Sequence, residues 1–144
     1  MNIEHVLARK GATVITIRPD QSIREALGAL ALHNIGALVV VDEATRPVGI
    51  LSERDIVREA VTDERVFDRG VSALMTQDVI VATPADDLKA VAHTMTEKRI
   101  RHLPVVEGGR LVGIVSIGDV VKAQRDAYEG EVATLEMRIP PERP

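Results

Sequence analysis

One short phrase occurs twice in this chain. Residues 49–55 read Gly-Ile-Leu-Ser-Glu-Arg-Asp, and residues 113–119 read Gly-Ile-Val-Ser-Ile-Gly-Asp. An internal repeat of this kind predicts two copies of one structural unit that stack on each other. The repeat therefore limits the fold more strongly than any other feature of the sequence.

The repeat extends over most of the chain. Residues 13–42 align with residues 78–107, and residues 48–57 align with residues 112–121. The first block has 7 identical pairs in 30 and the second has 6 in 10. Identity is therefore concentrated in the Gly-x-x-Ser-x-x-Asp motif, which a chance repetition of a hydrophobic pattern would not produce.

Each copy predicts the order β-α-β-β-α, and hence an α/β fold of the α+β type in which helices cover small sheets. In the first copy we expect strands at 14–17, 36–41 and 48–51, a helix capped by Ser22 with Glu25 completing a capping box, and a helix from Ser52 to about Ala60. In the second copy we expect strands at 79–82, 102–106 and 111–115, a helix through Leu88 and Met95, and a last helix from Ser116 as far as residue 137.

A unit of about 60 residues buries too little surface to be stable alone, so we expect the two copies to pack together. We divide the chain into an N-terminal helix within residues 1–12, a first unit at 13–62, a connector at 63–77, a second unit at 78–128, and a C-terminal helix extension and tail at 129–144.

Composition excludes several classes of function. A net charge of −4 and only two aromatic residues, Phe67 and Tyr128, argue against a nucleic-acid partner. The absence of cysteine excludes thiolate chemistry, and the histidines lack the spacing of metal ligands, so we expect no metal site. No apolar run has the length of a membrane span and the N-terminus lacks a signal-peptide pattern, so we expect no membrane association and a cytoplasmic location.

The repeated motif has two interpretations. A serine followed three residues later by an acid is typical of a helix N-cap. The same residues also fit a nucleotide site: Ser52 and Ser116 stand where a strand meets a helix N-terminus, which favours phosphate. Asp55 and Asp119 follow one turn later and can accept the hydroxyls of a ribose. The preceding glycine allows a backbone or a ligand to approach closely.

Further candidates complete a nucleotide site around each motif. Arg54, Arg101, His102 and Lys10 are cations that can reach phosphates. A purine needs a slot between aliphatic side chains near exposed backbone, and the candidates for this slot are Thr13, Val14, Ile15, Ile35, Gly36 and Ala37 in the first copy and Val79, Ile80 and Ile100 in the second.

With these motifs the chain resembles a tandem pair of CBS domains, or Bateman module, over nearly its whole length. The resemblance rests on the two β-α-β-β-α units, the two motifs and the phrase Arg-His-Leu-Pro-Val at 101–105. It implies two units related by a pseudo-twofold axis, two clefts and homodimers. It also implies adenosine ligands (AMP, ADP, ATP, NAD(P)-type cofactors or S-adenosylmethionine), with Asp55 and Asp119 on ribose and Ser52 and Ser116 on phosphate.

Three functions remain open from the sequence. The first is a non-catalytic sensor of adenosine nucleotides whose occupancy is transmitted through a homodimer to an effector protein that the sequence does not identify. The second is an interaction scaffold in which the motifs are only helix caps. The third is a nucleotide-processing enzyme, against which stands the lack of a second acid, a Walker-type lysine loop or a nucleophile–base pair. The unequal neighbours Arg54 and Gly118 predict two clefts with different ligands or affinities.

Overall fold

The computed structural model describes residues 1–127, and the end of the last predicted helix lies outside this part. The first copy of the repeat contains one three-stranded sheet in the order β1-β2-β3, with β1 parallel and β3 antiparallel to β2. Its elements are β1 (Thr16–Ile17), α2 (Ile23–His33), β2 (Ala37–Val41), β3 (Pro47–Ser52) and α3 (Glu53–Ala60). The apolar run of β2 is buried at every position, as expected for a strand covered on both faces.

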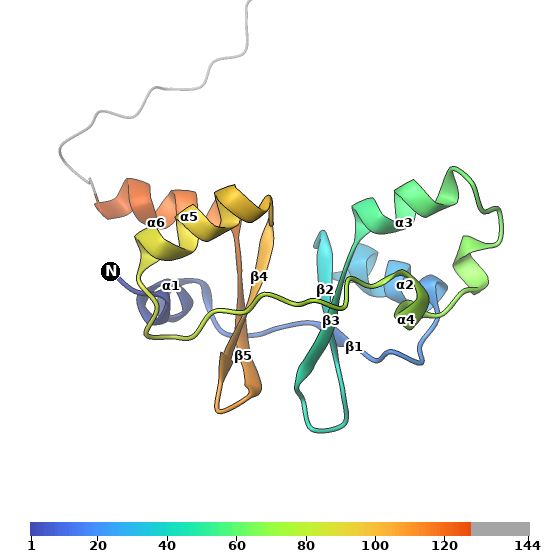
Figure 1. The fold of residues 1–144 in the computed structure, drawn as a ribbon, viewed down its shortest axis with the longest axis horizontal. Helices are drawn as coiled ribbons and strands as arrows, with labels where there is room; N and C mark the ends of the chain where they lie inside the picture. Colours follow the sequence, from blue (N-terminus) through green and yellow to red (C-terminus); the bar gives the residue numbers. More distant parts are fainter. Residues whose placement is uncertain (128–144) are drawn as a thin grey trace, which may run out of the picture.

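The second copy has the same plan with a smaller sheet. It consists of α5 (Leu88–Lys98), the antiparallel strands β4 (His102–Glu107) and β5 (Arg110–Ser116), and α6 (Ile117–Ala127). The strand expected at 79–82 is wrong in extent, because only Ala82 bridges to Val105 of β4. The strand expected at 14–17 likewise shortens to β1. Both segments follow a crossing between the two copies, and their backbones reach a sheet only at their last residues (Figure 1).

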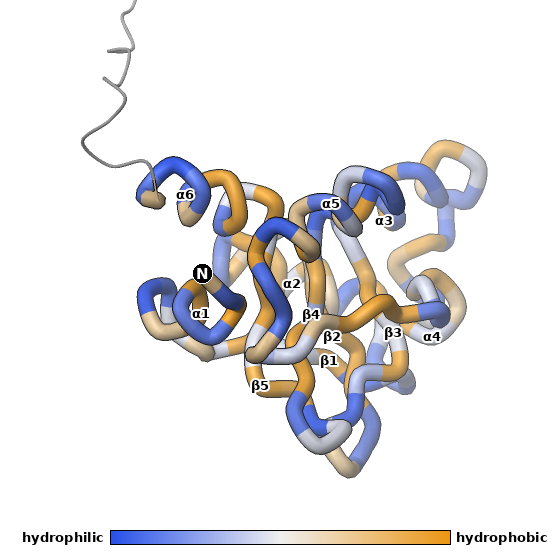
Figure 2. The backbone as a smooth tube through the Cα atoms, turned by 60° about the vertical axis from the view of Figure 1, so that its left-hand side comes forward, coloured by the Kyte–Doolittle hydropathy of each residue, from blue (hydrophilic) through white to orange (hydrophobic). Residues whose placement is uncertain are grey.

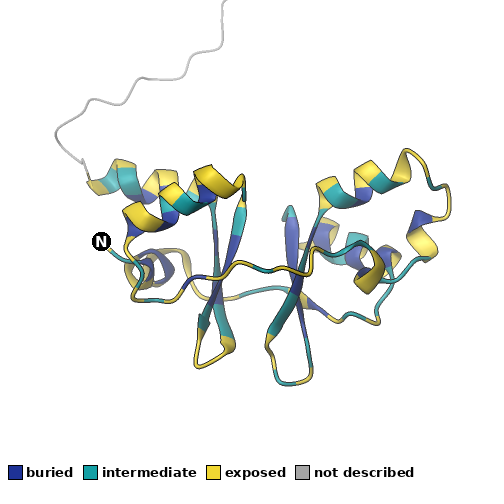
Figure 3. Cartoon of the chain, viewed as in Figure 1, coloured by how far each residue is buried: buried dark blue, intermediate teal, exposed yellow. Residues whose placement is uncertain are grey.

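The two sheets stand side by side between two groups of helices, which confirms the expected mixed fold of two packed units (Figure 1). Figure 2 shows the strands as the hydrophobic centre of the molecule and the helices with polar outer faces. Figure 3 shows the same division in burial. A period of 3.6 residues predicts one buried stripe along α2, formed by Ile23, Ala26, Leu27, Leu30 and Ala31. Ile23, Ala26 and Leu30 are buried, while Ala31 is exposed. Ser22 caps α2, but Glu25 accepts from the side chain of Gln21 instead of closing a capping box.

The short helices that precede each crossing are exchanged between the copies: each one comes just before one copy in the chain but packs on the other copy. α1 (Ile3–Lys10) packs its buried face into the core of the second copy, with Val91, Met95 and Val115. η1 (Val66–Asp68) and α4 (Val71–Leu74) pack into the core of the first copy. Equivalent backbone hydrogen bonds fix this exchange in both copies. In one copy, the Leu88 N–H donates to the carbonyl of Met1 and the Ile3 N–H to the carbonyl of Asp86. In the other, the Ile23 N–H donates to the carbonyl of Arg69 and the Val71 N–H to the carbonyl of Gln21.

The motif glycines make this exchange possible. A Cβ at Gly113 would lie 2.7 Å from Cδ2 of Leu7, and a Cβ at Gly49 would lie 2.5 Å from Sδ of Met75. These distances are shorter than van der Waals contact, so any side chain at either position displaces the neighbour. The sequence predicted that a backbone or a ligand comes close to these glycines; in the structure, the close neighbour is a core side chain from the exchanged segment.

Candidate functional site

Both motifs form helix caps at the ends of the half-buried strands β3 and β5. Asp55 N–H donates to Oγ of Ser52 over 3.2 Å, and Ser52 N–H donates to Oδ2 of Asp55 over 3.0 Å. Asp119 N–H donates to Oγ of Ser116 over 3.1 Å, and Ser116 N–H donates to Oδ2 of Asp119 over 2.8 Å. The capping interpretation is therefore realised, but no hydrogen bond within residues 1–127 uses Oδ1 of either aspartate. The caps leave that oxygen available to a ligand.

The motif of the second copy faces the strand ends of the first copy across a hollow of about 390 Å³, which we call cleft A. The aspartate and its aliphatic wall therefore come from different copies, separated by about a hundred residues in the chain. Cleft A is lined by Lys10, Thr13, Val14, Ile15, Ile35, Gly36, Ala37, His102, Ile114, Ser116 and Asp119.

The motif of the first copy faces the second copy in the same manner across a hollow of about 300 Å³, which we call cleft B. Strand β4 and the residues before it supply the opposite wall, as the repeat symmetry requires. Cleft B is lined by Gly36, Ala37, Ile50, Ser52, Glu53, Arg54, Asp55, Arg58, Thr76, Arg99, Ile100, Arg101 and His102.

The structure places all but two of the predicted site residues in these clefts. Val79 and Ile80 line neither cleft: the Val79 N–H bonds to the carbonyl of Gln77, and the side chain of Ile80 is exposed. Prediction from the sequence missed the lining residues Ile50, Ile114, Glu53, Arg58, Thr76 and Arg99. Two signals could have found some of them, because Ile50 and Ile114 are an identical pair of the repeat and Arg58 lies one helical turn after Arg54.

Lys10 is bound to Asp119, the aspartate of cleft A that is predicted to accept ribose hydroxyls. Its Nζ donates to Oδ2 of Asp119 and, over 2.8 Å, to the carbonyl of Ile114. Burial alone raises the pKa of Asp119, but the hydrogen bonds from Lys10 and Ser116 outweigh burial and hold this pKa below its ordinary value. Asp119 is therefore ionised and already paired, and a ligand that used both of its oxygens would compete with Lys10.

His102 lines both clefts, as do Gly36 and Ala37. Burial lowers the pKa of His102, and the positive charges of Lys10 and Arg101 lower it further, while Asp119 and Glu53 oppose this shift. The imidazole is thus held neutral at the wall shared by two hollows. An anion in either cleft would favour its protonated form.

The burial of His102 predicts that the stability of the protein depends on pH. Because the pKa of His102 is lower in the folded protein, the unfolded chain takes up the proton first, and the free energy of unfolding falls as the pH drops below about 6.5. Replacing His102 by glutamine should flatten this part of the curve, by at most about 1.4 kcal/mol per pH unit. Urea denaturation of wild type and His102→Gln at pH 5 to 8 measures how the free energy of unfolding changes with pH. The difference between the two proteins at pH 8 reports the change in packing alone. If the two curves are parallel over this pH range, the lowered pKa of His102 is contradicted.

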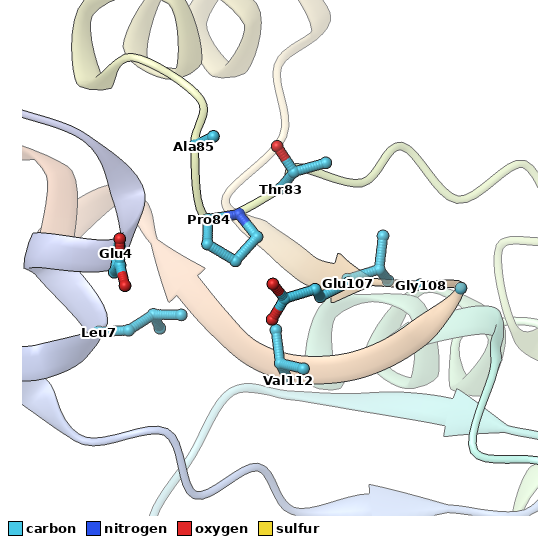
Figure 4. Close-up of a pocket in the computed structure, with 10 residues that line it drawn as sticks. Glu4, Leu7, Thr83, Pro84, Ala85, Glu107, Gly108 and Val112 are labelled. Atoms are coloured by element: carbon cyan, nitrogen blue, oxygen red, sulfur yellow. The ribbon is translucent and has the colours of Figure 1, made fainter.

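A larger hollow, of about 570 Å³, lies elsewhere, between α1 and the β4–β5 hairpin (Figure 4). The side chains of Glu4 and Glu107 border it together with the apolar Leu7, Pro84 and Val112. Its lining holds two carboxylates and no lysine, arginine or histidine. This charge disfavours a phosphate, so size alone does not make it the nucleotide site.

Residues 1–127 contain neither a candidate metal site nor a candidate membrane span. No group of three or more His, Asp or Glu side chains in this part of the chain is placed to hold a metal ion. None of its helices is both long enough and apolar enough to cross a membrane.

Comparison with known proteins decides the family. The sequence model of the CBS domain matches residues 7–62 and again residues 71–126. The chain belongs to the CBS domain family. It is a tandem CBS pair, and the crystal structure of the CBS-domain protein ATU1752 from Agrobacterium tumefaciens has the same fold, with a TM-score of 0.82, 42% identity, and coverage of 86% of this chain and 99% of that one.

Other relatives of this CBS pair differ in length. CBS domain-containing protein YhcV from Bacillus subtilis is 34% identical over 77% of this chain and 79% of its own length. The chain spans only 39% of protein MJ1225 from Methanocaldococcus jannaschii, with which it shares 38% identity over 76% of this chain. The CBS pair of protein MJ0100, solved in complex with 5′-methylthioadenosine and S-adenosyl-L-methionine, is 30% identical, with a TM-score of 0.79 and coverage of 88% of this chain and 98% of that one.

Proposed function

We propose that this CBS pair is a non-catalytic regulatory module that binds adenosine-containing ligands in clefts A and B. The observation that carries the proposal is that each Ser-x-x-Asp cap faces, across a hollow, the strand ends of the other copy. The complex of the related MJ0100 pair with two adenosine derivatives supports this ligand class.

The proposed pose follows from the chemistry of each wall. In cleft A, Val14, Ile15 and Ile35 offer an aliphatic slot for an adenine ring. Oδ1 of Asp119 accepts a ribose hydroxyl, and the hydroxyl of Ser116, at the positive end of the α6 dipole, donates to a phosphate. The Ile117 and Asp119 amides of that turn already donate to the carbonyl of Arg101 and to Oγ of Ser116. In cleft B, Asp55 and Ser52 take the same roles, and Ile50 and Ile100 bound the base.

The shared wall offers a route by which the clefts influence each other. Gly36, Ala37 and His102 line both hollows, so a ligand that moves this wall in one cleft changes the shape of the other. We propose that this change is passed to a homodimer and from there to an effector protein in the cytoplasm. Coupling of this kind requires that the ligand binds one arrangement of the wall more tightly than the other.

The proposed dimer surface comprises Val57 on α3, Val61 at the C-cap of α3, and Ile117 and Val121 on α6. These four apolar side chains are exposed by 63%, 81%, 38% and 56%, respectively. The two helices lie along the same edge of the molecule, the upper edge in Figure 1. Because Val57 and Val121 are equivalent in the repeat, a second copy of the chain can present the same surface in return, as a twofold interface requires.

Charging this surface should dissociate the dimer. Val57→Glu combined with Val121→Glu places two carboxylates where apolar contact is proposed, and we expect the sedimentation coefficient to fall from the dimer to the monomer value at micromolar concentration. Leu32→Glu is the matched control, since Leu32 is 79% exposed on α2, outside this surface. If the charged variant sediments as the wild type does, the dimer uses another surface.

Identification of co-purified ligand tests the proposal directly. Native mass spectrometry of the purified protein is expected to show one or two adenosine-containing adducts, which are then named after release. If nucleotide-free protein binds no adenosine compound, the scaffold interpretation is favoured. If a bound nucleotide is converted to product, the enzyme interpretation is favoured.

A further inference from the structure

The two clefts differ sharply in charge. Arg54, Arg58, Arg99 and Arg101 line cleft B, against the two carboxylates of Glu53 and Asp55. Within residues 1–127 none of these four arginines lies within 4 Å of a carboxylate oxygen, whereas six other lysine and arginine side chains do. Four unpaired guanidinium groups around one hollow repel each other, and a polyanion would relieve that repulsion.

The arginines surround the hollow from two sides. Arg54 and Arg58 stand one turn apart on α3, in the first copy. Arg99 and Arg101 come from the segment between α5 and β4, in the second copy. A chain of phosphates extending from the N-terminus of α3 would therefore meet planar, bidentate donors on both walls.

Cleft A has no such cluster. The repeat places Gly118, Lys122, Asn34 and Gly36 where cleft B has its four arginines, and only Gly36 of these lines cleft A. The one lysine that lines cleft A, Lys10, is bound to Asp119 and to the carbonyl of Ile114. Cleft A is therefore close to electrically neutral.

The backbone at Arg99 gives an independent indication. Arg99 ends α5 in the left-handed conformation, with φ of 54°, and its counterpart Asn34 ends α2 with φ of 50°. Asparagine tolerates this conformation and arginine does so less well. The second copy therefore carries an arginine, directed to cleft B, at a position whose backbone favours another residue.

We propose that cleft B is selective for adenosine ligands with two or three phosphates, and that cleft A takes adenosine ligands with no more than one. This assignment rests on the proposed function and adds to it which cleft binds the phosphate chain. A module of this kind would compare two classes of adenosine compound in one chain.

Single-cleft variants separate the two sites. Asp119→Ala, made together with Lys10→Gln so that no unpaired cation is left in cleft A, leaves the ribose acceptor of cleft B, and Asp55→Ala leaves that of cleft A. Calorimetric titration with adenosine, AMP, ADP and ATP, without divalent cations, is expected to show dissociation constants for Lys10→Gln/Asp119→Ala that fall about tenfold or more from AMP to ATP. For Asp55→Ala they should change less than about threefold. If the dissociation constants fall by the same factor from AMP to ATP in both variants, the assignment is overturned.

The arginines are then tested within the Lys10→Gln/Asp119→Ala protein. Adding Arg99→Gln and Arg101→Gln should bring the dissociation constant of ATP to within about threefold of that of AMP. Arg110→Gln is the matched control, because Arg110 is exposed on β5 and lines neither cleft. Circular dichroism and thermal unfolding establish that each variant is folded at the titration temperature. A tenfold preference for ATP that survives the double replacement would overturn the role of these arginines.

Inorganic tripolyphosphate separates this inference from the proposed function, since it lacks the nucleoside. Binding of tripolyphosphate to wild type, weakened by salt and lost in Arg99→Gln/Arg101→Gln, supports the anionic selectivity of cleft B even if no nucleotide binds. Adenosine ligands that bind without any gain from added phosphates leave the proposed function intact and overturn the inference. A chain that binds neither probe contradicts both.

Discussion

Replacing Asp55 and Asp119 together by alanine is expected to abolish stabilisation by adenosine ligands. In the wild type, a ligand at about a hundred times its dissociation constant adds about 2.7 kcal/mol to the free energy of unfolding. For a chain of this size that raises Tm by roughly 5–10 °C. Both aspartates lose their role as ribose acceptors in the variant, so thermal unfolding with and without ligand should give the same Tm.

The matched control separates ligand binding from helix capping. Each aspartate also bonds to the backbone of its serine, so alanine removes a cap and lowers Tm without ligand. Asp87 caps α5 through the amides of Lys89 and Ala90 and lies outside both clefts. Asp87→Ala should therefore lower Tm while keeping the ligand response. If the double variant keeps this response as well, the aspartates are only caps.

Truncation of Leu7 should destabilise the whole module, although Leu7 lies near the N-terminus. Leu7 is nearly buried in the core of the second copy, where it covers Gly113. Leu7→Ala is expected to lower the free energy of unfolding by about 2–4 kcal/mol, the usual cost of a large-to-small change in a core. Gly113→Ala forces a methyl group against Leu7 and should cost about 1–3 kcal/mol. Urea denaturation measures both values.

The double variant Leu7→Ala/Gly113→Ala distinguishes this contact from two independent effects. The smaller side chain at position 7 leaves room for the new methyl group, so the double variant should be more stable than the sum of the single losses by about 1 kcal/mol. Leu32→Ala, at an exposed position of α2, should change stability by less than about 0.5 kcal/mol. Strict additivity would show that α1 does not pack on Gly113 in solution.

Local features of the site were predictable because a few neighbouring residues encode them. Ser52 and Ser116 end their strands and cap their helices as expected, since the acid that completes each cap is three residues away. The buried stripe of α2 followed from a helical period of 3.6 residues. The same reasoning overestimated the strand at 79–82, because an apolar run does not reveal where a crossing chain reaches its sheet.

The exchange of α1 was not predictable from its own pattern. Amphipathic periodicity shows that Ile3, Val6 and Leu7 need an apolar partner, but not that this partner lies in the second copy. The two clefts depend on the same long-range pairing, because each joins a motif to the wall of the other copy. The prediction for Val79 and Ile80 failed for this reason. They are equivalent in the repeat to Val14 and Ile15, which line cleft A, but they do not line cleft B.

The sequence by itself determined the repeat, the order of its elements and the residues at the two caps, because side-chain periodicity and capping bonds act over one or two turns of chain. Only the tertiary structure decided that Lys10 binds Asp119, that His102 stands between two clefts, and that the arginines gather in one of them. The physical reason is that these contacts join residues far apart in the chain. Which surfaces meet is set by the burial of both cores together, and no local pattern records that choice.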